Sequence, residues 1–278
     1  MNIIDVDQKA ILGTGYGLVP DLALSALIWC TLFAIIYYAP DPASVSSLPK
    51  GTYLDLKNRM TSFIHGVFIL ILSAYQVYFA FTECGDATNS TEYFILVVSG
   101  GYFTYDFSLM AILGLLDLDM AIHHNMCVGG ILVVLSQNMG AGFVVQGLFV
   151  AEVSNPAMHM RIMLRHLGMR YTRAYEVAEY AYFTSFFFGR IIIGHPVVWA
   201  TVTCPSVSKF AQFISVGILM QSYMFLYRMY FILNSRIKET TERKTKGIKN
   251  RWFEPIPQKT LEECNFWLKS QKVKEKLP

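Results

Sequence analysis

The sequence predicts an all-α, polytopic membrane protein with seven transmembrane helices. Of its 278 residues, 54% are apolar or aromatic and only 15% are charged, whereas a soluble domain of this length carries more charge. The apolar residues also form long runs, of the length that a helix needs to cross a bilayer core about 30 Å thick. A third observation, the uneven distribution of basic residues between the predicted loops, supports the same fold class.

The seven predicted spans follow one another with short connections. The fourth and fifth form a tight hairpin around "SQNMGAG". The sixth contains "GHP", where Pro196 lacks a backbone donor and is expected to kink or end the helix. The spans cover residues 18–39, 60–82, 93–116, 122–137, 139–160, 177–203 and 210–234.

Basic residues lie almost entirely on one side of this topology. Nineteen of the 23 Lys and Arg fall in the segments 40–59, 161–176 and 235–278, and the opposite side holds only Lys9 and Lys209. The asymmetry places the basic C-terminal tail, 235–278, on the positive side (cytosol or matrix) and the polar N-terminus, 1–17, opposite. The tail also carries six Glu, and we interpret it as a solvated helix rather than a lipid-binding patch.

Two further features bear on the compartment. We expect neither a cleavable signal peptide nor an Arg-rich presequence, so the endoplasmic reticulum and the mitochondrial inner membrane both remain open. Cys84 and Cys204 fall in two loops on the side with few cations, where a disulfide could form if that side is oxidising. We expect free thiols.

Ionisable side chains inside the spans indicate a structural or functional role, because inserting one at mid-bilayer costs on the order of 3 kcal/mol on insertion scales. Neutral glutamines accompany them at Gln76, Gln146 and Gln221. The ionisable residues are His65, Asp106, His123, His124, Glu152, Arg190, His195 and Arg228.

Residue counting at about 1.5 Å per residue brings several of these groups to similar depths. His124 and Glu152 lie at one level on neighbouring helices, with His65 near it. Asp106, Arg190 and Gln221 are expected about two turns deeper. Two helical stripes, one of Ser99, Tyr102 and Asp106 and one of Glu152, Asn155 and His159, agree with a shared interior.

We therefore expect the polar groups to converge on one cavity that is open toward the positive side. The alternative is structural: buried polar residues can hydrogen-bond across helices at under about 1 kcal/mol each. Asp106 with Arg190 is the pair that best fits that alternative, as a buried ion pair. A functional cavity is the better interpretation for the set as a whole.

Clustered histidines also raise the question of a metal. Di-iron membrane enzymes need several histidine-rich boxes, but this chain has six His in separate segments and a single adjacent pair. Adjacent residues on a helix point about 100° apart, so both rarely bind one ion. A single ion held by His65, one of the pair and Glu152 is an alternative, but we expect no metal.

Six blocks in order resemble the TLC domain, the family of translocon-associated, ceramide synthase and related membrane proteins. The resemblance covers about residues 60–234 and implies a barrel of six transmembrane helices around a central cavity, with the span 18–39 as an addition outside it. The blocks are "SFIHG" (62–66), "GYFTYDF" (101–107), "AIHHN" (121–125), "FVAEVSNPAMHMR" (149–161), "FFFGRI" (186–191) and "LMQSYMFLYRM" (219–229).

One departure from the family pattern bears on chemistry. In ceramide synthases, paired histidines and a downstream Asp-x-x-Asp segment form the acyl-transfer site. The matching positions here are His123 and His124, with Glu152 and Asn155 in "AEVSN". Glu152 could orient one histidine, but Asn155 cannot take a proton. The chain therefore resembles the branch outside the ceramide synthases, whose members are linked to membrane phospholipid composition or lipid handling.

Three functional hypotheses follow. The first is a protein that binds or handles a lipid or acyl chain in the cavity, with His123, His124 and Glu152 at its polar headgroup and His65, Tyr102, Asp106, Asn155, Arg190 and Gln221 around it. The second is a non-catalytic accessory subunit of a large membrane complex, such as one of the mitochondrial inner membrane, docked through its termini.

The third hypothesis is an acyltransferase. It would use acyl-CoA as co-substrate and no other cofactor, with His124 as base or acyl acceptor, Glu152 orienting it, and Arg161 and Arg165 meeting the CoA phosphates. Membrane lipids are the expected partners in every case, with other membrane subunits as a further class, and we expect no nucleic acid.

Overall fold

The computed structural model describes residues 17–267, and within this range all regular secondary structure is helical. The predicted polar N-terminus (1–17) and the end of the basic tail, beyond residue 267, lie outside the described residues, apart from Gly17. The helices are α2 Leu18–Tyr38, α3 Ala43–Ser46, α4 Lys50–Phe79, α5 Ser90–Ile112, α6 Leu118–Gln137, α7 Ala141–Glu152, α8 Asn155–His166, α9 Arg173–Phe186, the π-helix η1 Phe187–Ile193, α10 Gly194–Thr203, α11 Lys209–Thr245 and α12 Gln258–Glu262.

Six helical segments of the described range are long and apolar enough to cross a membrane. Five are α2, α4, α5, α6 and α11, and the sixth runs continuously over Arg173–Thr203 through α9, η1 and α10. The predicted fifth span, 139–160, is instead made by α7 and α8. Each has 12 residues, about 18 Å of helix, so neither crosses the bilayer core alone. Pro156, in the first turn of α8, cannot donate to a preceding carbonyl, which accounts for the break.

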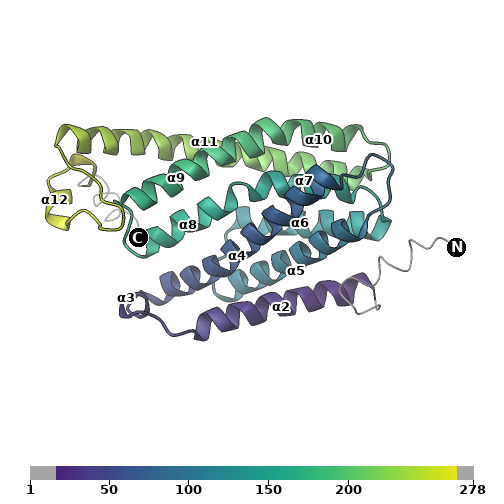
Figure 1. Ribbon diagram of the computed structural model, residues 1–278, viewed down its shortest axis with the longest axis horizontal. Helices are drawn as coiled ribbons and strands as arrows, with labels where there is room; N and C mark the ends of the chain where they lie inside the picture. Colours follow the sequence, from purple (N-terminus) through teal and green to yellow (C-terminus); the bar gives the residue numbers. More distant parts are fainter. Residues whose placement is uncertain (1–16, 268–278) are drawn as a thin grey trace.

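The transmembrane helices form a closed cycle of neighbours. Around the cycle, α4 packs on α5, α5 on α6, α6 on α11 and α11 on α10. α7 and α8 close the cycle, because α7 contacts α10, α8 contacts α9, and both contact α4. α7 also contacts α5, α6 and η1, so it lies toward the interior. Figure 1 shows α11 and α9 along one edge of the bundle and α2 along the other. This arrangement agrees with a barrel of six elements that has α2 outside it.

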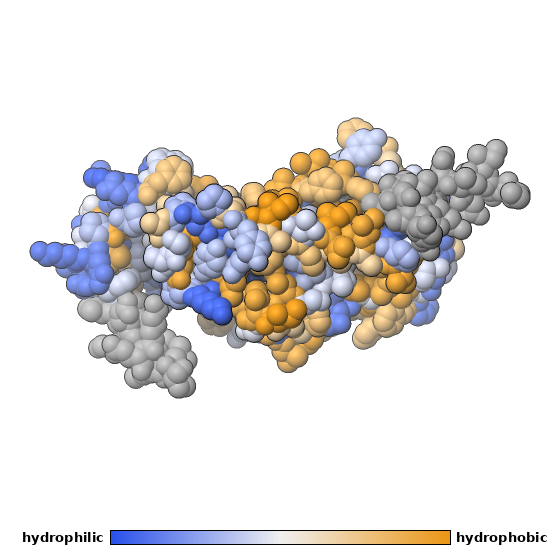
Figure 2. Space-filling view, turned by 90° about the horizontal axis from the view of Figure 1, so that it is seen from below, coloured by the Kyte–Doolittle hydropathy of each residue, from blue (hydrophilic) through white to orange (hydrophobic). Residues whose placement is uncertain are grey.

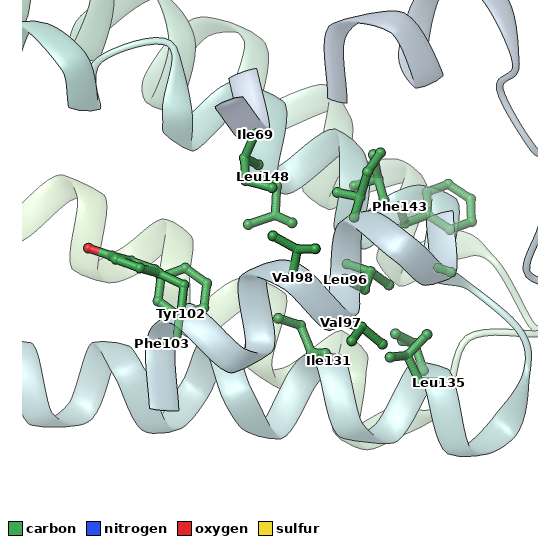
Figure 3. Close-up of a cluster of buried hydrophobic side chains, with 14 of the residues drawn as sticks. Ile69, Leu96, Val97, Val98, Tyr102, Phe103, Ile131, Leu135, Phe143 and Leu148 are labelled. Carbon is green, nitrogen blue, oxygen red and sulfur yellow. The ribbon is translucent and has the colours of Figure 1, made fainter. Parts of the chain in front are cut away.

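α2 is attached to the cycle through α5, and it also contacts α4. Gly100 and Gly101 allow the approach, because a Cβ at Gly101 would overlap Ser25 and the backbone of Ala26. Trp29 Nε1 donates to the Val98 carbonyl at 3.1 Å, and Ser25 Oγ donates to the same oxygen at 3.3 Å. Between α4, α5, α6 and α7 lies the main apolar core, part of which is drawn in Figure 3.

One end of the bundle is tied together by its loops. Cys84, after α4, forms a disulfide with Cys204, after α10, so the expectation of free thiols was wrong. The Thr88 amide donates to the Asn138 carbonyl of the α6–α7 hairpin at 3.1 Å. The three loops predicted on the side with few cations are therefore gathered at one end. Bringing the two cysteines together is a consequence of the helix cycle, which loop positions in the sequence do not reveal.

The opposite end carries the polar segments. Figure 2 shows hydrophobic residues over the middle of the molecule and hydrophilic ones gathered toward the end where α3 and α12 lie in Figure 1. α11 continues to Thr245, and the following segment folds back so that Ile256 and Leu261 pack on Tyr171. The described part of the tail is therefore helical and largely exposed up to Thr245, and the expected solvated helix does not extend over the segment that folds back.

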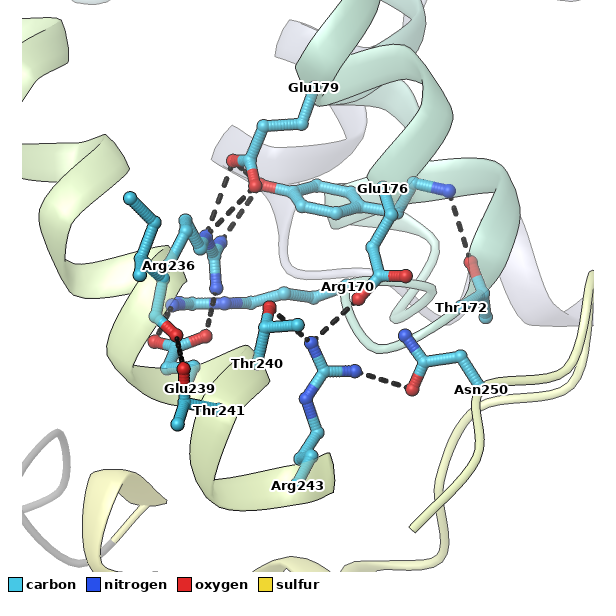
Figure 4. A network of polar contacts seen from close by, with 12 residues as sticks. Arg170, Thr172, Glu176, Glu179, Arg236, Glu239, Thr240, Thr241, Arg243 and Asn250 are labelled. Atoms are coloured by element: carbon cyan, nitrogen blue, oxygen red, sulfur yellow. Dashed lines mark hydrogen bonds and ion pairs between the residues drawn. The ribbon is translucent and has the colours of Figure 1, made fainter. Parts of the chain in front are cut away.

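The reason is a network of buried ion pairs, drawn in Figure 4. Arg236 of α11 pairs with Glu179 of α9 at 3.0 Å and also with Glu239. Arg161 of α8 pairs with the same Glu179 at 2.8 Å. Residues predicted to face water thus satisfy one another beneath the tail, because buried charges must be paired. The network joins α8, α9 and α11 at this end of the bundle.

Candidate functional site

The first half of the site is a hydrogen-bonded chain that joins α4, α5 and α6. His124 Nε2 lies 2.9 Å from Asp106 Oδ2, and its Nδ1 lies 2.8 Å from the Met120 carbonyl. Asn58 Nδ2 donates to Asp106 Oδ1 at 2.7 Å, and Tyr105 donates to Asn58 Oδ1 at 2.9 Å. All four side chains are buried, so the chain is satisfied internally.

This arrangement fixes a proton. Only an N–H can face the Met120 carbonyl, so the network assigns a hydrogen to His124 Nδ1. The contact between Nε2 and Asp106 then needs a second hydrogen, either on the ring or on the carboxyl group. His124 and Asp106 therefore share one proton beyond those of a neutral imidazole and a carboxylate. Both ring nitrogens are occupied, and neither is free to meet a ligand.

His123 is held differently and faces the cavity. Gln221 Nε2 donates to the Asp119 carbonyl at 2.8 Å, which leaves its Oε1 to accept from His123 Nδ1 at 3.0 Å. His123 Nε2 therefore carries a lone pair in the neutral ring. Its neighbour is Cys127 Sγ at 3.7 Å. The two histidines of the pair thus have different partners and different chemistry.

The second half of the site lies where two helices are irregular. Glu152 ends α7 and Asn155 begins α8, and Asn155 Nδ2 donates to Glu152 Oε2 at 2.9 Å. Arg190 donates to Asn155 Oδ1 at 3.1 Å and to the Ala151 carbonyl at 3.2 Å. Gly66 gives the Glu152 carboxyl room, because a Cβ there would lie 3.1 Å from Oε2.

Arg190 projects from the π-helix η1, a geometry that often occurs at functional sites. The helix does not end at Pro196, contrary to one of the two predicted outcomes. The π-helical register would pair the Ile191 carbonyl with the missing N–H of Pro196. His195 Nδ1 donates to that carbonyl instead, at 2.5 Å, and Tyr223 donates to His195 Nε2 at 2.6 Å. His195, in the first turn of α10, thus has a structural role next to the π-helix.

A cavity of about 120 Å³ lies between α6, α7, α10 and α11. Its polar end is formed by His123, Glu152, Asn155 and Arg190. The remainder is mostly apolar, with Thr201 and Ser215 as further polar lining residues. The lining extends to Gly140 and Val207, beside the disulfide. The cavity thus runs toward the end with few cations, not toward the basic side as expected. At the basic end, Glu179 of α9 pairs with Arg161 of α8 and Arg236 of α11.

The nine sequence-predicted site residues fall into two groups. His123, Glu152, Asn155 and Arg190 line the cavity, whereas His65, Tyr102, Asp106, His124 and Gln221 do not. Asp106 and Gln221 bond directly to the two histidines, although residue counting placed them two turns deeper, because the helices are staggered. The Asp106–Arg190 ion pair of the structural alternative does not form, because Asp106 bonds to His124 and Arg190 to Asn155. Glu152, which could have oriented a histidine, accepts from Asn155.

The His65 ring stacks on the Tyr102 ring with centroids 3.6 Å apart. Trp29 of α2 contacts the His65 ring in an edge-to-face arrangement. Within residues 17–267, His65 Nε2 and His159 Nδ1 are buried without a hydrogen-bond partner. Such buried groups are commonly satisfied by water. No group of three or more His, Cys, Asp or Glu in the described part of the chain is arranged to hold a metal ion.

Sequence reasoning missed Asn58 and Cys127. Asn58 was placed just outside the second span, although it lies four and seven residues before Ser62 and His65, on one helical stripe. Cys127 lies one turn after His123, and this spacing was the available signal.

If His124 and Asp106 share a proton, two substitutions of Asp106 should differ in their effect on stability. In an Asp106→Asn variant, the new amide oxygen can accept from Asn58 while its NH₂ donates to a neutral His124 Nε2, so every group stays paired. Asp106→Ala leaves both partners buried and unpaired, which costs about 3 kcal/mol. Thermal unfolding in detergent should show Asp106→Asn close to the unchanged protein and Asp106→Ala far below it. Equal losses in the two variants would contradict the proton assignment.

Comparison with known families agrees with this architecture. A family model described as the TLC domain matches residues 55–243, which is more than half of the chain and contains every residue of the site described above. The predicted domain, 60–234, lies within the match. The chain belongs to the TLC-domain family.

Proposed function

We propose that this integral membrane protein binds the acyl chain of a lipid in the cavity between α6, α7, α10 and α11. The observation that carries the proposal is the cavity itself, which joins an apolar interior to one polar end. Its 120 Å³ is about ten times the space that one water molecule needs. An apolar cavity of this size favours hydrocarbon over water.

The polar end favours one kind of ligand group. Arg190 is a donor, and its Nε has no partner among the described residues. His123 Nε2 is an acceptor in the neutral ring. A carbonyl or carboxylate oxygen would accept from Arg190, and a neighbouring hydroxyl or amide hydrogen would be donated to His123. An acyl chain that ends in an ester, amide or acid meets both requirements.

Filling the cavity should remove the lipid. A Cβ at Gly147 would meet nothing within 4 Å, and Gly147 lines the cavity, so the side chain of Gly147→Leu starts in open space and should occupy part of the cavity. Gly51, in the exposed first turn of α4, is equally open, and Gly51→Leu is the matched control. Lipid extracted from each purified variant should be quantified by mass spectrometry. We expect Gly147→Leu to lose the bound species at an unchanged melting temperature, and retention of that lipid would refute the proposal.

Acyl transfer is a second candidate, favoured by the lone pair of His123 Nε2 at the cavity and by the fixing of Nδ1 by Gln221. A base that is oriented by a third group is the usual arrangement for activating a nucleophile. The basic residue available to CoA would be Arg165, which is exposed, because Arg161 is paired with Glu179.

Under acyl transfer, His123→Gln should abolish the release of CoA from acyl-CoA. The matched control, Asn125→Gln, changes an exposed neighbour on α6 and should keep the reaction. Equal CoA release by the unchanged protein and His123→Gln would rule out this candidate. The accessory-subunit hypothesis rests on docking through the termini, whose residues 1–16 and 268–278 lie outside the described part, and it stays a prediction.

The disulfide supports a proposal about orientation. Disulfides persist where the compartment is oxidising, so the end with Cys84 and Cys204 would face such a compartment and the basic end the cytosol or matrix. In sealed membranes, an impermeant reductant followed by an impermeant maleimide should label these cysteines only when added to the oxidising side. Labelling from the other side would reverse the orientation.

A further inference from the structure

A groove lined by basic residues lies at the polar end of the bundle, away from the interior cavity. It has a volume of about 690 Å³ and lies between the start of α9, the end of α11 and the segment that follows. Five cationic side chains line it against a single carboxylate, Glu176. The cations are Arg173, Arg243, Lys244, Lys249 and Arg251.

The buried member of this set is held in place. Arg243 pairs with Glu176 at 2.6 Å and donates to Asn250 Oδ1 at 2.5 Å, as Figure 4 shows. The other four cations are exposed. Arg251 also pairs with Glu254 at 2.6 Å, so the excess of positive charge comes from Arg173, Lys244 and Lys249 beside the fixed Arg243. This excess attracts an anion of more than one charge.

An apolar groove of about 410 Å³ lies between α4, α8 and α9. Its lining includes Phe63, Met160, Val177 and Trp252. Phe63 and Val177 belong to membrane-spanning segments. Trp252 and the adjacent Phe253 are 53% and 69% exposed, and tryptophan is enriched at the membrane–water interface. The groove thus lies in the leaflet nearest the basic end.

The two grooves adjoin along one seam. The Arg173 amide donates to the Arg251 carbonyl at 2.8 Å, and the Ala174 amide donates to the Trp252 carbonyl at 3.2 Å. Arg173 and Arg251 line the basic groove, while Ala174 and Trp252 line the apolar one. The Arg173 guanidinium also lies over the Trp252 ring, 5.9 Å from its centroid. A single ligand could therefore place a charged group in the basic groove and an apolar group in the neighbouring apolar groove.

We propose that these two grooves form a binding site for an anionic phospholipid of the surrounding leaflet. The headgroup phosphate would lie among the cations and one acyl chain along Phe63, Met160 and Val177. A free phosphate would use only the basic groove and would leave the apolar groove and the exposed aromatic pair unexplained. This site is separate from the interior cavity and does not depend on the function proposed for it.

The first test removes charge. The full-length protein in mild detergent is titrated with phosphatidylglycerol or phosphatidylcholine of the same acyl chains, and bound lipids are counted by native mass spectrometry. We expect the unchanged protein to prefer phosphatidylglycerol at least about tenfold. The triple variant Arg173→Gln, Lys249→Gln, Arg251→Gln should lose that preference. The control Lys50→Gln, Lys238→Gln, Lys259→Gln removes equal charge from exposed positions outside the groove and should keep it.

The second test removes space. Ala157 lines the apolar groove, and Ala157→Phe should lower phosphatidylglycerol binding without a change of charge, while Ala181→Phe on the exposed face of α9 should not. An unchanged preference in the triple variant would overturn the proposal. So would displacement of the lipid by soluble glycerol phosphate at matched concentration, because the site would then take a free anion.

Discussion

The pairing of His124 with Asp106 is the interaction on which the rest of the site depends. An apolar bundle cannot leave a carboxylate or an imidazole unpaired without a large cost. Here the Asp106 carboxyl accepts from α4 and meets α6, so one buried group fixes three neighbouring helices. Because His124 is turned into this contact, the adjacent His123 is directed about 100° away, into the cavity.

The other wall of the site is built from two irregular helices. The break between Glu152 and Asn155 brings both side chains to one place, and η1 carries Arg190 to them. A regular helix through residues 139–160 would also place positions 152 and 155 on one face, but the break leaves the Ala151 carbonyl open to accept from Arg190. Irregular backbone is tolerated at membrane depth where protein covers it or where it lines a cavity, and both conditions hold here.

Much of the architecture could be predicted from the sequence, and the reasons are physical. The length of the apolar runs predicted α2, α4, α5, α6 and α11, and the six sequence blocks indicated the domain family. Residue types inside the spans singled out His123, Glu152, Asn155 and Arg190, which line one cavity. The partners could not be predicted, because pairing depends on helix stagger: Asp106 binds His124 rather than Arg190. The closed basic end and the disulfide depend on contacts between segments far apart in the chain, Glu179 with Arg236 and Cys84 with Cys204.

An acyl chain in the cavity, with its polar end at His123 and Arg190, is the proposed ligand. The most direct measurement is an experimental density map of the protein purified from its own membrane into lipid nanodiscs. We expect continuous, elongated density from Gly140 and Val207 to the polar end, with its terminal group within hydrogen-bond distance of Arg190. If side chains of α6, α7 and α11 close the cavity, or if it contains only separate peaks of water, the proposed function is wrong.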